Sequence, residues 1–148
     1  MENHLVFRKG QAVLITRLIE GQFPDYEVVV PKTFSRRVVL EHERLLRALR
    51  RVSLLSNEKT KPVKLEFRHD SVILRSNTPE LGEAVEQIPA EYTGEDMDMG
   101  FNARYVLEAL SVMSGEQIAL ELNDPLSPGL VRLLNDPDYF YVVMPMRV

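Results

Sequence analysis

The fold is decided by the stretch VVLEHERLLRALRRVS at residues 38–53, where the apolar residues change from the spacing of a strand to that of a helix. Residues 38–40 predict a short β-strand that leads directly into a helix over residues 41–53. The stretch MDMGF at residues 97–101 predicts a second strand, and residues 102–113 predict a second helix, which begins sixty-one residues after the first. The chain therefore repeats a strand–helix unit.

Three further strands are expected after each helix. They cover residues 63–67, 71–75 and 83–88 in the first half, and residues 117–122, 129–134 and 140–144 in the second. Most links between them are as short as His69-Asp70, which indicates antiparallel neighbours rather than parallel strands joined by crossovers. The predicted fold class is therefore α+β, a duplicated β-α-β-β-β unit with both helices packed on one side of antiparallel sheet.

Both predicted helices are amphipathic at a spacing of 3.6 residues. In the first helix the apolar stripe and an arginine stripe lie on opposite faces, and in the second helix Asn102 is a candidate N-cap. We expect the apolar stripes to be core. The first contains Leu45, Leu46, Leu49 and Val52 opposite Arg44, Arg47 and Arg51; the second contains Tyr105, Val106, Ala109, Leu110 and Met113 opposite Arg104, Glu108 and Ser111.

The sequence predicts that the first thirty residues belong to another domain. Residues 5–8 and 12–19 predict a β-hairpin around Gly10, and residues 27–31 predict a short extended piece. Such a hairpin cannot bury enough surface to be stable alone. The polar segment after Pro31 resembles a connector, so we place a domain boundary there. Residues 1–30 are expected to end a preceding domain, and residues 31–148 to form a complete one.

Composition restricts the classes of function. The chain has 148 residues, of which 45% are apolar, and it has no cysteine, which excludes disulfides, thiolate metal sites and a cysteine nucleophile. No apolar run is long enough to span a bilayer, and the N-terminus does not resemble a secretory signal. We expect a cytoplasmic protein without a membrane partner.

The net charge of −4 argues against a protein that holds nucleic acid by bulk positive charge. The charges are nevertheless segregated. Residues 36–51 contain six arginines against Glu41 and Glu43, whereas residues 80–98 contain seven acids and no lysine or arginine. Two solvated faces are the more common explanation of such a pattern. The alternative is a pair of complementary edges, or of faces that meet different partners.

No catalytic, metal or cofactor site is predicted. The histidines, His4, His42 and His69, lie in separate segments without metal-ligand spacing, and we expect each to be a surface residue. The acids of residues 94–98 lack the spacing of a calcium loop and fit a solvated turn. The sequence contains neither a glycine-rich phosphate loop nor a GxSxG motif.

Two apolar segments remain for partners. Leu54 and Leu55 follow the first helix and either cap the core or form an exposed knob. The chain ends YVVMPMRV at residues 141–148, although free C-termini are usually polar. An apolar terminus indicates docking, and the flexible thioethers of its two methionines suit varied ligands.

Four stretches carry a resemblance to a known family. They are GQFPDY at residues 21–26, LLSNEK at 54–59, GFNARYVL at 100–107 and YVVMPMR at 141–147, and they span the chain. With these motifs the chain resembles the bacterial β sliding clamp, the processivity subunit of the replicative DNA polymerase. That subunit has three domains of the duplicated type derived above. The resemblance implies that this chain corresponds to the last strands of the second domain and the whole third domain.

The resemblance also implies a partner-peptide groove. Clamps receive the clamp-binding-motif peptides of DNA polymerases, clamp loader and repair proteins between the second and third domains. Val28 stands here where many members have arginine, and the groove's other subsite comes from a part of the second domain that this chain does not contain. The corresponding wall would be Pro24, Val28, Val29, Asn102, Tyr105, Gly129, Val142, Val143, Met144, Pro145, Met146, Arg147 and Val148.

A ring interface and a DNA-facing surface follow from the same resemblance. Clamp subunits form a head-to-tail homodimer, whose interface would use Arg51, Leu54, Leu55, Glu80, Glu83 and Glu86. Arg44 and Arg47 would face duplex DNA in the central hole. One domain cannot encircle DNA, so we do not expect the chain alone to hold it stably. The alternative function is a clamp-like fold that binds a small molecule or performs catalysis.

Overall fold

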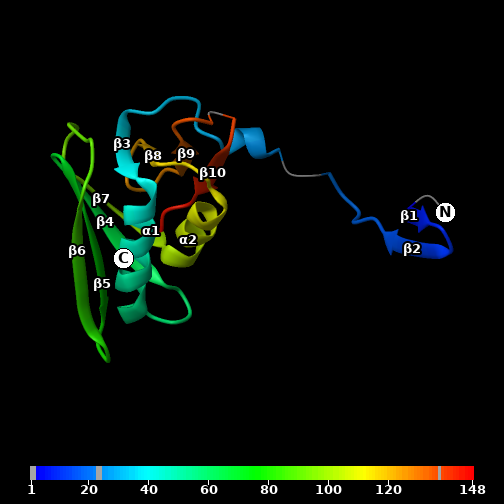
Figure 1. Cartoon of the computed structure of the whole chain (residues 1–148), viewed down its shortest axis with the longest axis horizontal. Coiled ribbons are helices and arrows are strands. Elements are labelled where there is room, and N and C mark those ends of the chain that lie inside the picture. Colours follow the sequence, from blue (N-terminus) through cyan, green and yellow to red (C-terminus); the bar gives the residue numbers. More distant parts are fainter. Residues whose placement is uncertain (1–2, 23–24, 137) are drawn as a thin grey trace.

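The duplicated unit predicted from the sequence forms the body of the molecule in the computed structural model, which describes residues 3–22, 25–136 and 138–148 (Figure 1). The fold class is α+β, as predicted. The first half consists of β3 (Arg36–Glu41), α1 (His42–Val52), β4 (Pro62–Arg68), β5 (Ser71–Thr78) and β6 (Gly82–Pro89). The second half repeats this order with β7 (Met97–Asn102), α2 (Ala103–Val112), β8 (Gln117–Leu122), β9 (Gly129–Leu133) and β10 (Phe140–Val143).

The two halves exchange their first strands. The sheets have the orders β6-β5-β4-β7 and β10-β9-β8-β3, and all neighbours are antiparallel, so β7 joins the sheet of the first half and β3 that of the second. Isolated bridges Val39–Glu91 and Gly100–Met146 add two equivalent connections, each between an exchanged strand and the segment that follows the last strand of a half. The halves are therefore interlocked and form one unit.

Local sequence signals explain several boundaries. The predicted two-residue link His69-Asp70 joins β4 to β5, where Arg68 pairs with Ser71. Asp70 takes the left-handed conformation (φ 56°), which aspartate tolerates better than most residues. At the start of α2, the Asn102 side chain accepts a hydrogen bond of 2.9 Å from the Arg104 amide. This confirms the predicted N-cap.

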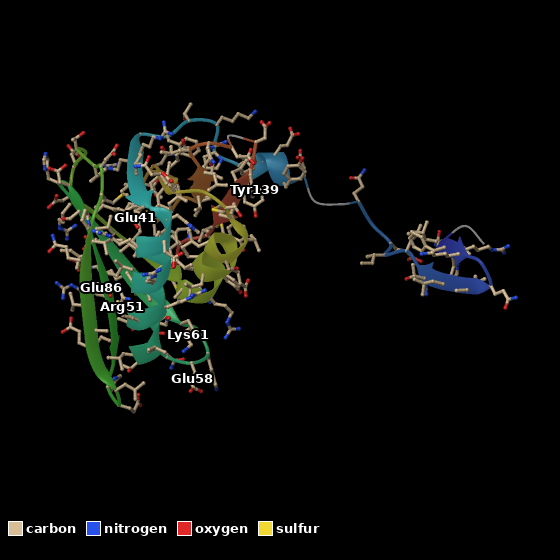
Figure 2. All side chains as sticks on the ribbon, in the orientation of Figure 1. Glu41, Arg51, Glu58, Lys61, Glu86 and Tyr139 are labelled. Atoms are coloured by element: carbon tan, nitrogen blue, oxygen red, sulfur yellow. The ribbon has the colours of Figure 1, made fainter. Side chains whose placement is uncertain are left out.

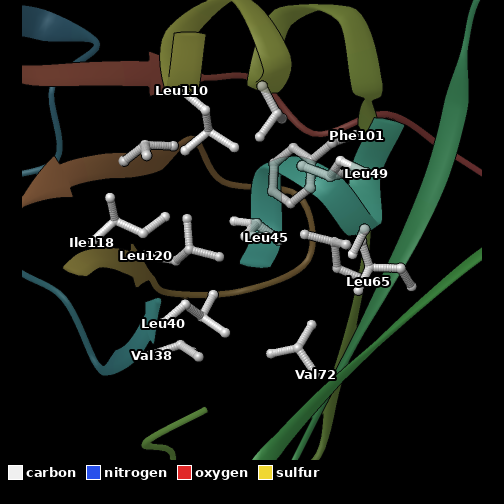
Figure 3. Packing of buried hydrophobic residues seen from close by; sticks show 14 of the residues in the cluster. Val38, Leu40, Leu45, Leu49, Leu65, Val72, Phe101, Leu110, Ile118 and Leu120 are labelled. Atoms are coloured by element: carbon white, nitrogen blue, oxygen red, sulfur yellow. The ribbon is translucent and has the colours of Figure 1, made fainter. Parts of the chain in front are cut away.

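The core lies where both helices meet both sheets. Figure 3 shows Leu45 and Leu49 of α1, Leu110 of α2, Leu65 of β4 and Leu120 of β8 converging on one region. All five are less than 5% exposed. Each buried leucine contributes about 1.5–3 kcal/mol by transfer from water, and the shared core joins the halves energetically.

Two local predictions were wrong. Residues 27–31 were expected to be extended, but Tyr26–Val28 form the short 3-10 helix η1, because the Asp25 side chain accepts a hydrogen bond from the Glu27 amide and turns the chain. Tyr105 was expected to point inward but is 51% exposed. It precedes the buried Val106 by one residue, and one helical residue is a rotation of about 100° away from the core.

The N-terminal hairpin consists of β1 (His4–Lys9) and β2 (Ala12–Arg17), with Gly10 at a positive φ of 59° in its two-residue turn. Figure 1 shows it apart from the body of the molecule. Every residue of both strands is exposed, including Phe7 at 54% and Leu14 at 62%. The hairpin contributes nothing to the core described above.

The expectation that all three histidines are surface residues was wrong for His42. His4 and His69 are exposed, as predicted, but the side chain of His42 is buried at the first position of α1. Its Nε2 lies 2.8 Å from the carbonyl oxygen of Leu110 in α2. The His42 amide also donates to the carbonyl of Glu116 at 2.9 Å. His42 therefore fixes the start of α1 against the end of α2.

Replacing His42 with alanine is expected to lower the free energy of unfolding by about 1–3 kcal/mol, because the buried Leu110 carbonyl loses its side-chain donor. Urea unfolding followed by far-UV circular dichroism measures the change. His69→Ala is the matched control, since that ring is exposed, and it should shift the free energy by less than about 0.5 kcal/mol. Equal stabilities for the two variants would contradict a structural role for His42.

Candidate partner-binding site

The C-terminal tail, defined here as residues 144–148, crosses the strand β7 after leaving β10. The Met146 amide donates a hydrogen bond of 2.8 Å to the Gly100 carbonyl. A Cβ on residue 100 would meet the Met146 carbonyl oxygen and would lie 2.5 Å from a Val148 methyl group. Glycine at position 100 therefore permits the close approach of tail and strand.

Hollows flank the end of the tail on two sides. One, of about 360 Å³, is lined by residues of β4, β7 and the β8–β9 link, and the other, of about 580 Å³, by residues around β4 and β5. Both are lined by Met146, Arg147 and Val148. The smaller also includes Lys64, Asp98, Met99, Gly100, Pro125 and Leu126; the larger includes Thr60, Pro62, Lys64, Arg75, Ser76, Asn77 and Glu83.

The predicted groove residues of β10 and the tail differ in exposure. Val143 is 3% exposed and pairs with the buried Gly129 of β9, so these two residues belong to the interior rather than to the exposed surface of the predicted groove. Met144 is 60% exposed and Val148 is 63% exposed. The remaining members are half-buried or exposed: Val142, Pro145 and Met146 are half-buried, and Arg147 is exposed.

The other predicted groove residues do not line the hollows beside the tail. Asn102 is half-buried and its side chain caps α2, while Tyr105, Val28 and Val29 are 51%, 79% and 50% exposed. Pro24 lies outside the described residues. The two hollows that flank the tail are lined by none of these. The tail and Gly129 are thus brought together through β10, whereas Val28 and Val29 belong to η1 and the residue after it.

Sequence reasoning missed two residues at the tail. Gly100 was noticed only as part of a motif, yet a glycine inside a predicted strand is itself a signal of close backbone approach. Leu126, in the link between β8 and β9, is 71% exposed and lines the smaller hollow. Nothing in its local sequence indicates this, because the contact comes from folding.

The predicted interface residues gather at the end of α1 and along β6, here named the edge surface. The Arg51 guanidinium donates to Glu86 at 3.0 Å and holds the pKa of that carboxyl below its ordinary value. Leu54 is 71% exposed, as expected. Leu55 is only half-buried rather than fully exposed, and its carbonyl accepts a hydrogen bond from the Thr78 hydroxyl at 2.9 Å.

The acidic strand β6 is the edge of its sheet, so one side of its backbone is unpaired within the described strands. Glu80 lies in the turn before β6 and is exposed. Glu83 is bound to Arg75 of β5 at 3.1 Å. The acids of this region are therefore partly neutralised by arginines of the same chain.

The two arginines predicted to face DNA lie on the exposed side of α1, and each has an acidic neighbour. Arg44 lies 3.3 Å from Glu41, and Arg47 lies 2.8 Å from Glu43. In Figure 2 the label of Glu41 marks the start of this helix and that of Arg51 its end. The stripe carries less free positive charge than the sequence indicates.

Among the described residues, no group of three or more histidine, cysteine or acidic side chains is arranged to hold a metal ion. No helix in the same part of the chain combines the length and the apolar character that crossing a membrane requires.

Comparison with known proteins identifies the family. Residues 27–147 match the family model described as DNA polymerase III beta subunit, C-terminal domain. The chain belongs to this family. A beta sliding clamp of Pseudomonas putida is 37% identical over 147 residues, covering 99% of this chain and 40% of the relative. A beta sliding clamp of Caulobacter vibrioides is 38% identical over 142 residues, covering 96% of this chain and 38% of the relative.

Solved sliding clamps share the fold. The DNA polymerase sliding clamp of Pseudomonas aeruginosa, solved with a ligand, superposes with a TM-score of 0.90 at 36% identity over all of this chain and 40% of its own. A sliding clamp of Bartonella birtlesii bound to griselimycin gives 0.91 at 35% identity, again over all of this chain and 40% of its own. The chain thus spans about two fifths of the length of these clamps.

Proposed function

We propose that the protein acts in bacterial DNA replication as part of a sliding clamp, the processivity factor of the replicative DNA polymerase. Family membership over residues 27–147 carries the proposal. Residues 1–30 would be the last strands of the preceding domain, which fits the fully exposed β1–β2 hairpin. Residues 31–148 would be the third domain. The chain is then one end of a ring-forming subunit.

The C-terminal tail and its surroundings would be the docking groove for short peptides of polymerases, clamp loader and repair proteins. Met144 and Val148 support this role, because both are more than half exposed and apolar. A leucine or phenylalanine anchor that buries this surface would contribute about 1.5–3 kcal/mol. Anchors of this kind dominate small interfaces.

The edge surface would form the head-to-tail contact with another subunit. Leu54 supplies an exposed apolar contact, and β6 offers an unpaired strand edge to which a strand of another chain could add. Such a heterologous contact closes a ring only when each subunit has both ends. The exposed side of α1, with Arg44 and Arg47, would then face the duplex.

Titration with a Gln-Leu-x-Leu-Phe peptide tests the proposal. We expect chemical-shift changes to cluster on Tyr105 and residues 144–148, with Pro24 as a further reporter. For residues 1–148 tested alone, the dissociation constant should be weak, about 10⁻⁴ M or higher, because the resemblance assigns only one of the groove's two subsites to these residues. Each tenfold loss of affinity corresponds to about 1.4 kcal/mol. Changes centred outside the predicted groove residues, or none at millimolar peptide, would show that this surface does not bind such peptides.

A further inference from the structure

One asparagine joins two segments that are far apart in the sequence. Asn123 is the first residue of the link between β8 and β9, and its side-chain oxygen accepts a hydrogen bond of 2.8 Å from the Ser35 amide. Its side-chain nitrogen donates to the Thr33 carbonyl at 2.9 Å. Thr33 and Ser35 belong to the segment that leads into β3, here named the connector and defined as residues 31–35. The side chain of Asn123 therefore fastens the β8–β9 link to the connector.

The backbone of Asn123 adds to this attachment. Its carbonyl oxygen accepts a hydrogen bond of 3.3 Å from the Ser35 hydroxyl and another from the Arg36 guanidinium, at the start of β3. An asparagine side chain carries a donor and an acceptor next to each other, so it can satisfy an amide and a carbonyl of another segment at once. Aspartate offers only the acceptor. Residue 123 thus has the chemistry that this attachment requires.

The next residue orders the rest of the link. The Asp124 carboxylate accepts hydrogen bonds of 2.8 Å and 2.9 Å from the amides of Leu126 and Ser127, and one of 2.6 Å from the Ser127 hydroxyl. Leu126 itself is 71% exposed, so packing against the core does not fix its position. The polar contacts of Asn123 and Asp124 hold this leucine in place instead.

We propose that Asn123 is a positioning residue of the partner groove, which fixes Leu126 at the rim by anchoring the β8–β9 link to the connector. Leu126 lines the smaller hollow beside the tail, together with Met146 and Val148. A peptide that docks there would meet a leucine that is already ordered, so binding would lose little conformational entropy in the link. This inference rests on the proposed docking role of the tail.

Titration of the complete chain with the Gln-Leu-x-Leu-Phe peptide tests the role of Asn123. Asn123→Ala should raise the dissociation constant about threefold, because a loosened link must be ordered when the peptide binds. Asn135→Ala is the matched control, since Asn135 is exposed in the link between β9 and β10 and lines neither hollow beside the tail. It should leave the constant unchanged. Thermal unfolding checks that each variant folds.

A double-mutant cycle shows whether Asn123 acts through Leu126. Leu126→Ala alone should raise the dissociation constant about three- to fivefold, and adding Asn123→Ala should raise it by less than about 1.5-fold more. Multiplied effects of the two changes would overturn the inference. Asn123→Asp is a milder second variant that keeps the acceptor for the Ser35 amide and loses the donor to Thr33. It should weaken binding less than alanine does, and unchanged affinity in both Asn123 variants would also overturn the inference.

Amide hydrogen exchange separates this inference from the proposed function. Asn123→Ala should speed exchange about fivefold or more at the Ser35 and Leu126 amides, whereas Asn135→Ala should not. Unchanged exchange at Leu126 would show that Asn123 does not order the link, even if the peptide binds at the tail. Absence of peptide binding by the unchanged chain would instead contradict the docking groove itself.

Discussion

Replacing Gly100 with alanine is expected to release the C-terminal tail from β7 and to lower the free energy of unfolding by about 1–3 kcal/mol. The added Cβ would meet the Met146 carbonyl, which is backbone, and a Val148 methyl at 2.5 Å. Backbone cannot give way as a side-chain end can, so the hydrogen bond from the Met146 amide to residue 100 should break. Urea unfolding and amide exchange at Met146 measure the two effects.

Gly115→Ala is the matched control. Its Cβ would come within 2.9 Å of a Leu133 methyl group and 3.0 Å of the Asn135 side-chain oxygen, both of which lie at the ends of side chains that can move. We expect a smaller loss of stability and an unchanged Met146 amide. If Gly100→Ala left stability and amide protection as they are, the tail would not depend on close approach to β7.

Replacing Met144 with aspartate is expected to abolish peptide binding while the fold remains intact. Met144 is 60% exposed, so the free protein tolerates a charge there. A bound apolar anchor would remove water from that carboxylate, and burying an unpaired charge costs several kcal/mol. Since the expected affinity is already only about 10⁻⁴ M, binding should fall below detection at millimolar peptide. The peptide titration and a thermal unfolding curve measure both effects.

Leu54→Asp controls for the added charge. Leu54 is 71% exposed and lies on the edge surface rather than in the predicted groove, so peptide binding should be unchanged. Met146→Asp should also abolish binding, although Met146 is half-buried and some stability should be lost as well. Peptide affinity equal to that of the unchanged chain in Met144→Asp would exclude Met144 from the groove.

Local order was predictable from the sequence because it depends on neighbours within a few residues. The change of period at residues 38–53 predicted β3 and α1, the Asn102 cap predicted the start of α2, and His69-Asp70 predicted a tight turn. The apolar tail identified the segment that is now proposed as a groove wall. Four short motifs were sufficient to indicate the family, which the comparisons confirmed.

The contacts between residues that are far apart in the sequence could be learned only from the tertiary structure. The exchange of β3 and β7 joins residues separated by dozens of positions, and neither strand's composition specifies its partner. Burial of His42 and exposure of Tyr105 depend on where the other helix and the sheets lie, which periodicity does not show. The arginine stripe of α1 was visible in the sequence. Only the folded chain shows that Arg51 pairs with Glu86 across 35 residues, while Arg50, Lys61 and Arg104 line one hollow.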